Sequence, residues 1–407
     1  MPRGEGSGAL RVAVLGAGPI GLDAALAGLE RAHRVDVYEA GKRPASNVWD
    51  WGHVRLFSPW SMNISNRMRQ HMERVGIAFG VDEGAFPTGR QLVEELLDPL
   101  WKHAVPLPSL HLGSRVISVA REGVLKHEEI GDPERANRPF RILLEDSDGM
   151  ERIARADVVL DCTGKYGNPN SLGDGGIPAL GEQVYSQELI RRIPDIENEA
   201  ELWAGRVTLL LGSGHSAQTA VTKLAELSTH APDTRVIWAI RGQVSDWPVI
   251  HRDPLSGRNE LVEAAVGFAL GASPAVELRT GVVLEELYRA EGRMGARLRG
   301  LHGDVEDLGA DTVLGLVGGV GDHRLYRQLQ VHECYATSGP MKLAAALLGS
   351  SSADCLAQES HGIDMLRNPE PNFFLLGDKS YGRNNTFLLK NGWQQVDDVF
   401  QELSETS

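Results

Sequence analysis

Residues 11–29, RVAVLGAGPIGLDAALAGL, constrain the fold more than any other stretch of this chain. An apolar run of residues 12–15 ends in the glycine-rich turn GAGPIG, and an alanine-rich helical pattern follows, which predicts a strand, a tight turn and a helix. In such a turn the first glycine permits the bend, the second lets a pyrophosphate approach the backbone, and the third lets helix and strand pack closely. The free N–H groups at the start of the helix attract phosphates. We therefore predict a dinucleotide-binding unit.

An acidic residue supports this interpretation. A second apolar run, residues 34–38, ends in Glu39, and an acid at this point accepts hydrogen bonds from the 2′-hydroxyl of a ribose. The alternative is a glycine-rich turn that binds nothing. Strand, turn, helix and acid occur here in the expected order, which favours the dinucleotide-binding interpretation.

The same order of elements occurs a second time in residues 206–224, RVTLLLGSGHSAQTAVTKL. Another apolar run, residues 235–240, ends in Arg241, and ADTVL at residues 310–314 matches ADVVL at residues 156–160. Self-similarity of this kind is typical of a repeated structural unit. The sequence thus predicts two dinucleotide-binding units in one chain.

The two predicted units differ in the charge that follows their second strand. Glu39 suits a free 2′-hydroxyl, whereas Arg241, with His251 and Arg252 downstream, suits a 2′-phosphate. We therefore expect the first unit to bind an adenine ribose without a phosphate and the second to prefer NADPH. Because Arg241 lies further from its glycine turn than Glu39 does, a solvated surface arginine is the alternative.

The size and charge of the chain limit its class. With 407 residues it is too long for one ordinary core, so two or three domains are expected. A net charge of −14 argues against nucleic-acid partners and anionic membranes, because both require a basic surface. The first residues lack an apolar signal-peptide core, and no apolar run reaches the roughly 18 residues of a membrane span. We expect a cytoplasmic protein without membrane contact, and a homodimer is the default expectation for its assembly.

The three cysteines, Cys162, Cys334 and Cys355, are scattered and form no CxxC motif. The chain therefore lacks the usual local redox dithiol and the usual zinc pattern, and no metal site is predicted. We expect reduced cysteines, as is usual in the cytoplasm. A Cys334–Cys355 disulfide is the alternative.

Residues 41–70 show no clean helical or strand period. The segment combines aromatic with basic side chains, namely Trp49, Trp51, Trp60, His53 and Arg55. The functional interpretation is a wall around a flat ring system, and the alternative is a hydrophobic cluster beneath a loop. The interleaved basic residues favour the functional interpretation.

The C-terminal stretch predicts a strand at residues 373–376, followed by Gly377-Asp378 and a helix. We expect this helix to start near Asn385–Thr386, with Asn385 as its N-cap, and to run to about Leu403. Its N-terminus would stabilise negative charge on a bound ring, and the alternative is an ordinary terminal helix.

Five motifs together resemble those of the flavin-containing and N-hydroxylating monooxygenases, a group of flavoproteins with two dinucleotide-binding domains. They are GAGPIG with Glu39, GSGHSA at Gly212 to Ala217, Phe86-Pro87-Thr88, Cys162-Thr163-Gly164, and Leu376-Gly377-Asp378. After Phe86-Pro87-Thr88 we expect an amphipathic helix over residues 90–103, which Pro99 ends or kinks. Residues 51–60 and 379–396 are similar to a bacterial subgroup of flavin monooxygenases, some of which are encoded with arsenic-resistance genes. The resemblance covers most of residues 10–400.

The resemblance implies an α/β fold with two Rossmann-like domains of the three-layer ββα/βαβ type. FAD would occupy a discontinuous domain of residues 1–170 and 315–407, and NADPH a domain of residues 175–312, with the Gly- and Pro-rich residues 165–182 as the linker.

The resemblance also implies an FAD-dependent, NADPH-using monooxygenase. It would use O2 to oxygenate a heteroatom, such as a nitrogen, of a small-molecule substrate through a C4a-hydroperoxyflavin. The alternative is an NAD(P)H:acceptor oxidoreductase or oxidase without oxygen insertion. A flavin-binding sensor is disfavoured because a sensor needs no hydride donor.

One motif of the group is altered in this chain. Where these monooxygenases carry FxGxxxHS, Gly181 and Ser186 are kept, but Ala179 and Tyr185 replace the Phe and the His. This departure argues against Baeyer–Villiger chemistry and weakens the oxygenase assignment.

The candidate catalytic residues are Asn63 and Ser65, as hydrogen-bond donors to a reacting oxygen, and Arg55 and His53, which would orient the flavin or the substrate. The segment His332–Thr337 is expected to line the substrate pocket, with a plain surface loop as the alternative. The residues predicted to bind FAD are Gly16, Gly18, Pro19, Ile20, Gly21, Glu39, Trp51, His53, Arg55, Val116, Thr163, Gly164, Gly377, Asp378, Arg383, Asn385 and Thr386. The residues predicted to bind NADPH are Gly212, Ser213, Gly214, His215, Ser216, Ala217 and Arg241.

Overall fold

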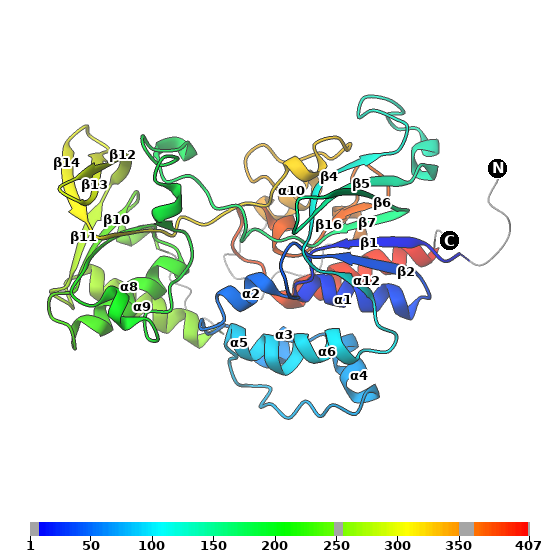
Figure 1. Ribbon diagram of the computed structural model, residues 1–407, viewed down its shortest axis with the longest axis horizontal. Coiled ribbons are helices and arrows are strands. Elements are labelled where there is room, and N and C mark those ends of the chain that lie inside the picture. Colours follow the sequence, from blue (N-terminus) through cyan, green and yellow to red (C-terminus); the bar gives the residue numbers. More distant parts are fainter. Residues whose placement is uncertain (1–7, 248–254, 350–361, 406–407) are drawn as a thin grey trace. The chain divides into compact units, whose positions relative to one another are not determined.

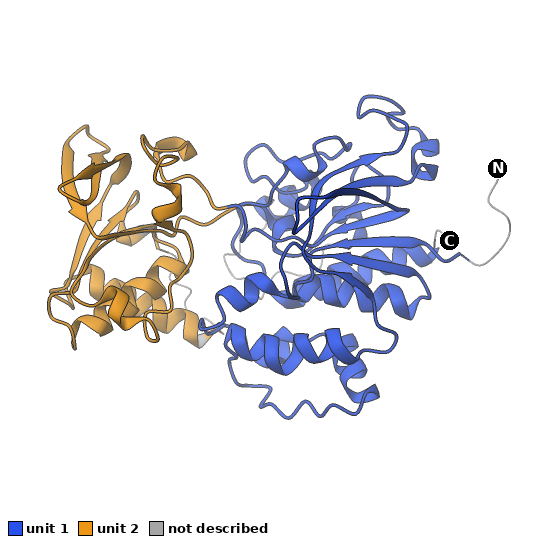
Figure 2. Ribbon diagram, in the orientation of Figure 1, with its two compact units in different colours: residues 1–168, 320–407 blue, residues 169–319 orange. Residues whose placement is uncertain are grey.

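The structure, a computed structural model, describes residues 8–247, 255–349 and 362–405. It divides into two compact units: residues 1–168 with 320–407 form unit 1, and residues 169–319 form unit 2 (Figure 2). The boundaries expected from the sequence, which enclose residues 175–312 as the second domain, lie a few residues inside those of unit 2.

A parallel sheet forms the centre of unit 1, in the order β16-β7-β1-β2-β3 (Figure 1). Its strands are β1 (Arg11–Leu15), β2 (Arg34–Tyr38), β3 (Ser109–His111), β7 (Val158–Asp161) and β16 (Phe373–Leu375). Successive residues of a strand point to opposite faces. Both faces are apolar here, because Val12 and Val14 belong to one core and Ala13 and Leu15 to another. A sheet with two apolar faces must be covered on both sides.

Helices cover the first face of this sheet, and an antiparallel meander covers the second. The helices α1 (Pro19–Glu30) and α12 (Leu389–Glu405) contribute Leu26 and Phe400 to the first core, and α4 (Asn66–Arg74) adds Met68 to it from beyond α1 (Figure 1). The strands β4 (Ser114–Arg121), β5 (Phe140–Asp146) and β6 (Glu151–Ala156) contribute Phe140 and Ile142 to the second. Unit 1 therefore has three layers.

The helix expected over residues 90–103 is present but not uniform. It comprises α5 (Gly89–Gln91), a π-helical segment (Leu92–Leu97) and α6 (Asp98–His103). Pro99 has no N–H for the α-helical ladder and its ring crowds the preceding turn, so the wider π turn before it relieves the clash. The other helices of unit 1 are α2 (Ser46–Asp50), α3 (Trp60–Asn63), α10 (Met341–Gly349) and α11 (Ile363–Leu366).

Unit 2 repeats this plan, with a parallel sheet in the order β11-β10-β9-β15-β8. Its strands are β8 (Leu189–Ile190), β9 (Val207–Leu211), β10 (Arg235–Ile240), β11 (Val276–Thr280) and β15 (Thr312–Gly315). The helices α8 (His215–Ser228) and α9 (Ser256–Ala269) pack on one face, and α7 (Ala200–Trp203) joins the same core. The meander of β12 (Val282–Ala290), β13 (Arg293–Gly300) and β14 (Val305–Ala310) packs on the other.

The repeated ADxVL motif makes the same contact in both units. The carboxylate of Asp157 accepts a hydrogen bond from the backbone N of Arg11 at 2.9 Å, and that of Asp311 from the backbone N of Val207 at 2.8 Å. These contacts align Arg11 with Val207, so the two glycine turns occupy the same register after their strands. The sequence repeat therefore corresponds to a structural repeat.

The C-terminal helix starts later than predicted. It begins at Leu389, and Asn385 is therefore not its N-cap. The side-chain oxygen of Asn384 accepts hydrogen bonds from the backbone N and the hydroxyl of Thr386, at 2.9 and 2.7 Å, and so closes a turn where the first helical turn was expected. Within the described ranges, no helix combines the length and the apolar character needed to cross a membrane.

Candidate dinucleotide-binding sites

The first glycine turn has a separate geometric reason for each of its glycines. Gly16 has a φ of +94°, and a Cβ there would lie 2.9 Å from the carbonyl oxygen of Cys162. A Cβ on Gly21 would lie 2.0 Å from the carbonyl oxygen of Gly16, so only glycine lets α1 approach the strand this closely. A Cβ on Gly18 would meet no atom of the described residues within 4 Å. The turn is thus closed at two glycines and open at the one that a pyrophosphate would approach.

The start of α1 and Glu39 complete this turn. Gly18 is the N-cap of α1 and has no side chain to offer the first N–H groups, and Pro19 at the first helical position has no N–H at all. Glu39 is half-buried, and its carboxylate accepts hydrogen bonds from the backbone N of Ala17 and of Gly41, both at 2.8 Å. The predicted acid therefore lies against the turn, where an adenine ribose would meet it. These residues fit a dinucleotide.

A second turn lies beside the first because β7 is the neighbour of β1 in the sheet. After β7, one oxygen of Asp161 accepts hydrogen bonds from the backbone N and the hydroxyl of Thr163, at 3.1 and 2.6 Å. Gly164 follows with a φ of +69°, and a Cβ there would meet no described atom within 4 Å. The structure thus places Thr163 and Gly164 at the edge of the first glycine turn.

The late Gly-Asp motif also reaches this edge. Gly377 has a φ of +73°, and a Cβ there would lie 3.1 Å from the side chain of Ile20 at the start of α1. Asp378 forms an ion pair with Lys165 at 2.7 Å. Burial raises the pKa of Asp378 above its ordinary value, and the nearby Lys165 ammonium opposes that shift. The motifs around Gly16, Thr163 and Gly377 therefore converge at the carboxyl ends of the unit 1 strands.

The aromatic segment is held mainly by residues 86–90. Trp51 packs against Gly89, where a Cβ would lie 2.5 Å from its ring, and exposed Arg55 donates a hydrogen bond to the carbonyl oxygen of Phe86 at 2.6 Å. The ring of Trp49 lies between two guanidinium groups, at 3.5 Å from that of Arg43 and 3.4 Å from that of Arg90. His53 is half-buried in the same segment. These contacts fix the segment without assigning it a ligand.

Asn63 and Ser65 are buried and form hydrogen bonds within the protein, which argues against the catalytic roles predicted for them. The buried Asn63 amide donates to the carbonyl oxygens of Ser58 and Pro59, at 2.8 and 3.0 Å, and accepts from the hydroxyl of Ser58 at 2.8 Å. Ser65 caps α4, accepting from the backbone N of Met68 at 3.0 Å, and donates to the fully buried Asp23 at 2.5 Å. Both side chains therefore stabilise the fold around α3 and α4.

The other predicted FAD residues are dispersed. Val116 lies in β4, at an irregularity in the pairing of β4 with β5. Arg383 and Asn385 are exposed, and Thr386 belongs to the turn closed by Asn384. Lys165, which follows the Thr163–Gly164 turn, donates hydrogen bonds to the carbonyl oxygens of Gly382 and Asn384, at 3.0 and 3.3 Å, and so connects the loop that contains Arg383 to that turn.

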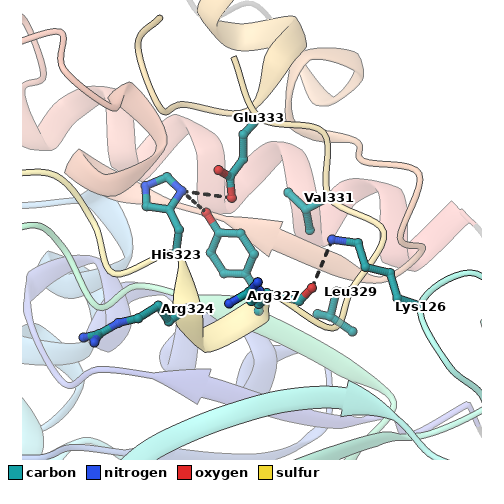
Figure 3. A pocket seen from close by; sticks show the side chains of 8 residues that line it. Lys126, His323, Arg324, Arg327, Leu329, Val331 and Glu333 are labelled. Atoms are coloured by element: carbon teal, nitrogen blue, oxygen red, sulfur yellow. Dashed lines mark hydrogen bonds and ion pairs between the residues drawn. The ribbon is translucent and has the colours of Figure 1, made fainter. Parts of the chain in front are cut away.

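One residue of the segment that was expected to line a substrate pocket, Glu333, lines a pocket of unit 1, and whether this pocket binds a substrate stays a prediction. A pocket of about 300 Å³ is lined by Lys126, His323, Arg324, Tyr326, Arg327, Leu329, Val331 and Glu333 (Figure 3). Glu333 belongs to the predicted segment and contacts His323 at 2.9 Å, whereas Tyr335 is 96% exposed. Burial acts to raise the pKa of Glu333, but its hydrogen bonds with His323 and Tyr326 outweigh this and lower that pKa.

The glycine turn of unit 2 has the same backbone and a different chemical setting. Gly212 has a φ of +126°, and a Cβ there would lie 2.2 Å from the carbonyl oxygen of Leu316. A Cβ on Gly214, the N-cap of α8, would meet no described atom within 4 Å. Ser213 and Ser216 are exposed and His215 is half-buried, while Ala217 is fully buried.

The end of β10 replaces the acid of unit 1. The pairing of β9 with β10 aligns Ile240 with Glu39, and Ile240 is buried. Arg241 comes one position later and is exposed. His251 and Arg252, expected to assist it, lie outside the described residues.

The described cysteines show no redox pair. Cys162 and Cys334 are free, and Cys355 lies outside the described residues. Burial raises the pKa of the Cys162 thiol well above its ordinary value, so this thiol is a poor source of thiolate.

Comparisons with known proteins establish the fold. No protein-family model matches this chain, and no curated protein matches its sequence. Among solved structures, a bacillithiol disulfide reductase from Bacillus cereus is similar at a TM-score of 0.70 and 18% identity, over 98% of this chain and 99% of that one. An ornithine N-hydroxylase from Kutzneria sp. 744, with reduced FAD, NADP⁺ and L-ornithine in its structure, is similar at 0.63 and 13%, over 98% and 99%. Thioredoxin reductase from Lactococcus lactis is similar at 0.58 and 13%, over 97% and 98%.

The chain therefore has the fold of two-domain, Rossmann-type flavoproteins. The α/β fold with two Rossmann-like units, expected from the sequence, is confirmed. Because one fold serves several redox activities, the particular activity must be argued from the sites.

Proposed function

We propose that this protein is an FAD-dependent, NADPH-using oxidoreductase, and that it acts as a monooxygenase on a small-molecule substrate. The proposal rests on the two glycine turns, which follow the strands β1 and β9 at equivalent positions. Both are open at their second glycine, but Glu39 follows the first and Arg241 the second. An acid suits the free ribose of FAD, and an exposed arginine suits the 2′-phosphate of NADPH.

Several residues of unit 1 would hold FAD. The N–H groups at the start of α1 would bind its pyrophosphate, and Glu39 would bind its adenine ribose. The turn at Thr163–Gly164 and the loop at Gly377 would border the rest of the molecule. When bound there, FAD would supply the redox chemistry, namely hydride acceptance from a nicotinamide and electron transfer to an acceptor.

The choice between oxygenase and reductase rests on the cysteines, because the fold is compatible with both activities. The solved structures of similar fold include an ornithine N-hydroxylase and also two kinds of reductase. Reductases that work through a dithiol need paired, reactive cysteines beside the flavin, whereas Cys162 and Cys334 are both free and burial raises the pKa of the Cys162 thiol. We therefore favour oxygenation of a heteroatom, such as the nitrogen of an amine. Electron transfer to an acceptor without oxygen insertion is the second candidate, because the altered FxGxxxHS motif favours it.

The test begins with the absorbance spectrum of the purified full-length protein, which should show bound flavin. The flavin is then reduced anaerobically with NADPH, and oxygen is admitted with and without a panel of small amines. An oxygenase should release less hydrogen peroxide per NADPH when its substrate is present, and ¹⁸O from O2 should appear in the product. Stoichiometric hydrogen peroxide with every amine would favour the second candidate, and absence of flavin would contradict both.

A further inference from the structure

The ammonium group of Lys379 is buried and fully hydrogen-bonded in unit 1. It donates hydrogen bonds to the carboxylate of Asp161 at 2.6 Å, to the hydroxyl of Thr163 at 3.1 Å and to the carbonyl oxygen of Asp322 at 2.9 Å. The Lys379 and Asp161 side chains are both 0% exposed. An ammonium has three N–H groups, and all three are used here. Lys379 therefore has no proton to offer a substrate, and its role is to hold other groups.

Three distant segments meet at this ammonium. Asp161 ends β7, Lys379 lies in the turn Gly377–Tyr381 after β16, and Asp322 lies where the chain re-enters unit 1. Gly321 makes room for the lysine stem, since a Cβ there would lie 2.3 Å from Cγ of Lys379. The ring of Tyr326, which also lines the pocket of Figure 3, lies 5.1 Å from the ammonium.

The ion pair shapes the turn that borders the first glycine turn. One oxygen of Asp161 binds Lys379 and the other binds the backbone N and the hydroxyl of Thr163. Thr163 is thereby locked from two sides, and Gly164 follows with its positive φ and open space around its Cα. A Cβ on Gly16 would lie 3.2 Å from Cα of Thr163, so the two turns are in direct contact.

Stability alone does not account for this pair. A buried ion pair is often no more stabilising than apolar side chains of similar volume, because both charges lose their hydration. What the ion pair does here is to set the shape of the Thr163–Gly164 turn and to attach that turn to two other segments.

We propose that Lys379 and Asp161 are positioning residues for the dinucleotide site of unit 1. They hold the Thr163–Gly164 turn in the form that FAD requires and tie it to Asp322. This inference rests on the proposed binding of FAD by unit 1. It assigns the pair no part in proton or hydride transfer.

The test separates the charge of the pair from its positioning role. Lys379→Met and Asp161→Leu should each lower the Tm of the full-length protein, because each leaves one buried charge unpaired. The double variant should unfold at a higher temperature than either single variant. Its affinity for FAD, measured by titrating deflavinated protein, should nevertheless be at least tenfold weaker than that of the wild type, and the visible circular dichroism of its bound flavin should change.

Gly321→Ala is a second probe that removes no charge. Its methyl group would displace the stem of Lys379, so FAD affinity should fall while the residues that contact FAD stay unchanged. The matched control is Glu370→Gln, which breaks the buried ion pairs of Glu370 with Arg121 and Arg135, at 2.7 and 2.8 Å. Glu370 precedes β16, whereas Lys379 follows it. This control should lower the Tm and leave FAD affinity within twofold.

Two results would overturn the inference, and they are distinguishable. Wild-type FAD affinity in both the folded double variant and Gly321→Ala would show that the pair is only structural, with the proposed function intact. A wild-type protein that binds no FAD would refute the proposed function and this inference together.

Discussion

The two glycine turns share a backbone but not a set of neighbours. In unit 1, α1 packs so closely that a Cβ on Gly21 would lie 2.0 Å from the carbonyl oxygen of Gly16. In unit 2 the equivalent residue is Ala217, which already carries a Cβ and is fully buried. The helix of unit 2 therefore stands further from its strand. Tight packing around a cofactor that stays bound, and looser packing around one that exchanges, is the interpretation that the comparison suggests.

The ends of the second strands extend this comparison. Glu39 binds the backbone of its own turn, whereas the aligned Ile240 is buried and the charge moves one residue on, to exposed Arg241. The acid is held by backbone N–H groups beside its turn, and the arginine is exposed to solvent. The difference between the units is thus one of packing as well as of charge.

The largest expected effect follows from exchanging the small residues of the two turns. Gly21→Ala should lower the free energy of unfolding by about 2 kcal/mol or more, because its methyl group overlaps a backbone oxygen, and FAD binding should be lost. Ala217→Gly should lower it by only about 1 kcal/mol, the helix propensity of glycine. Chemical denaturation and flavin absorbance measure both. Equal effects of the two exchanges would contradict the packing difference.

Removal of the acid should weaken the first site without unfolding it. Glu39→Gln should weaken FAD binding about 10- to 100-fold, because hydrogen bonds to a charged carboxylate contribute about 1.5–3 kcal/mol. Asp36→Asn is the control, since Asp36 lies in β2, the strand that Glu39 follows, but contacts His111 at 2.8 Å. Titration of deflavinated protein with FAD gives both affinities. Unchanged affinity in Glu39→Gln would remove Glu39 from the site.

Removal of the arginine should act on the second site alone. Arg241→Ala should raise the KM for NADPH about tenfold and leave that for NADH unchanged, because only the 2′-phosphate is lost as a partner. Arg235→Ala is the matched control, because Arg235 is an exposed arginine at the start of β10, the strand that Arg241 follows. Steady-state kinetics with both nucleotides provide the comparison. A parallel rise for NADH would mean that Arg241 does not recognise the phosphate.

The smallest effect concerns the pH dependence of stability that arises from Asp23 in α1, the helix after the first glycine turn. Burial raises the pKa of Asp23 in α1 to about 6. Because the folded state then holds this proton more tightly than the unfolded state, stability falls as pH rises through the range from 4 to 6. Between pH 5 and 7 this contributes a loss of about 1 kcal/mol, which Asp23→Asn should abolish. Urea denaturation at the two pH values tests it, and an equal pH dependence in the variant would contradict the shift.

The sequence predicted what local pattern controls and missed what distant contacts control. The strands, the glycine turns and Glu39 follow from periodicity and spacing along short stretches. The Lys379–Asp161 pair joins residues 218 positions apart, and no local pattern predicts that these two side chains meet. Asn63 and Ser65 lie in a segment without period, where an inward and an outward polar side chain look alike. The prediction that the C-terminal helix starts near Asn385 was wrong because the side chain of Asn384 closes a turn that the sequence pattern does not reveal.

Anaerobic stopped-flow reduction of the bound flavin by NADPH and by NADH compares the two units in one experiment. If unit 1 retains FAD and unit 2 recognises the 2′-phosphate of NADPH, the flavin absorbance of the purified protein should bleach at least tenfold faster with NADPH than with NADH at equal concentration. Protein without flavin absorbance, or flavin that both nucleotides reduce at the same rate, would contradict this prediction.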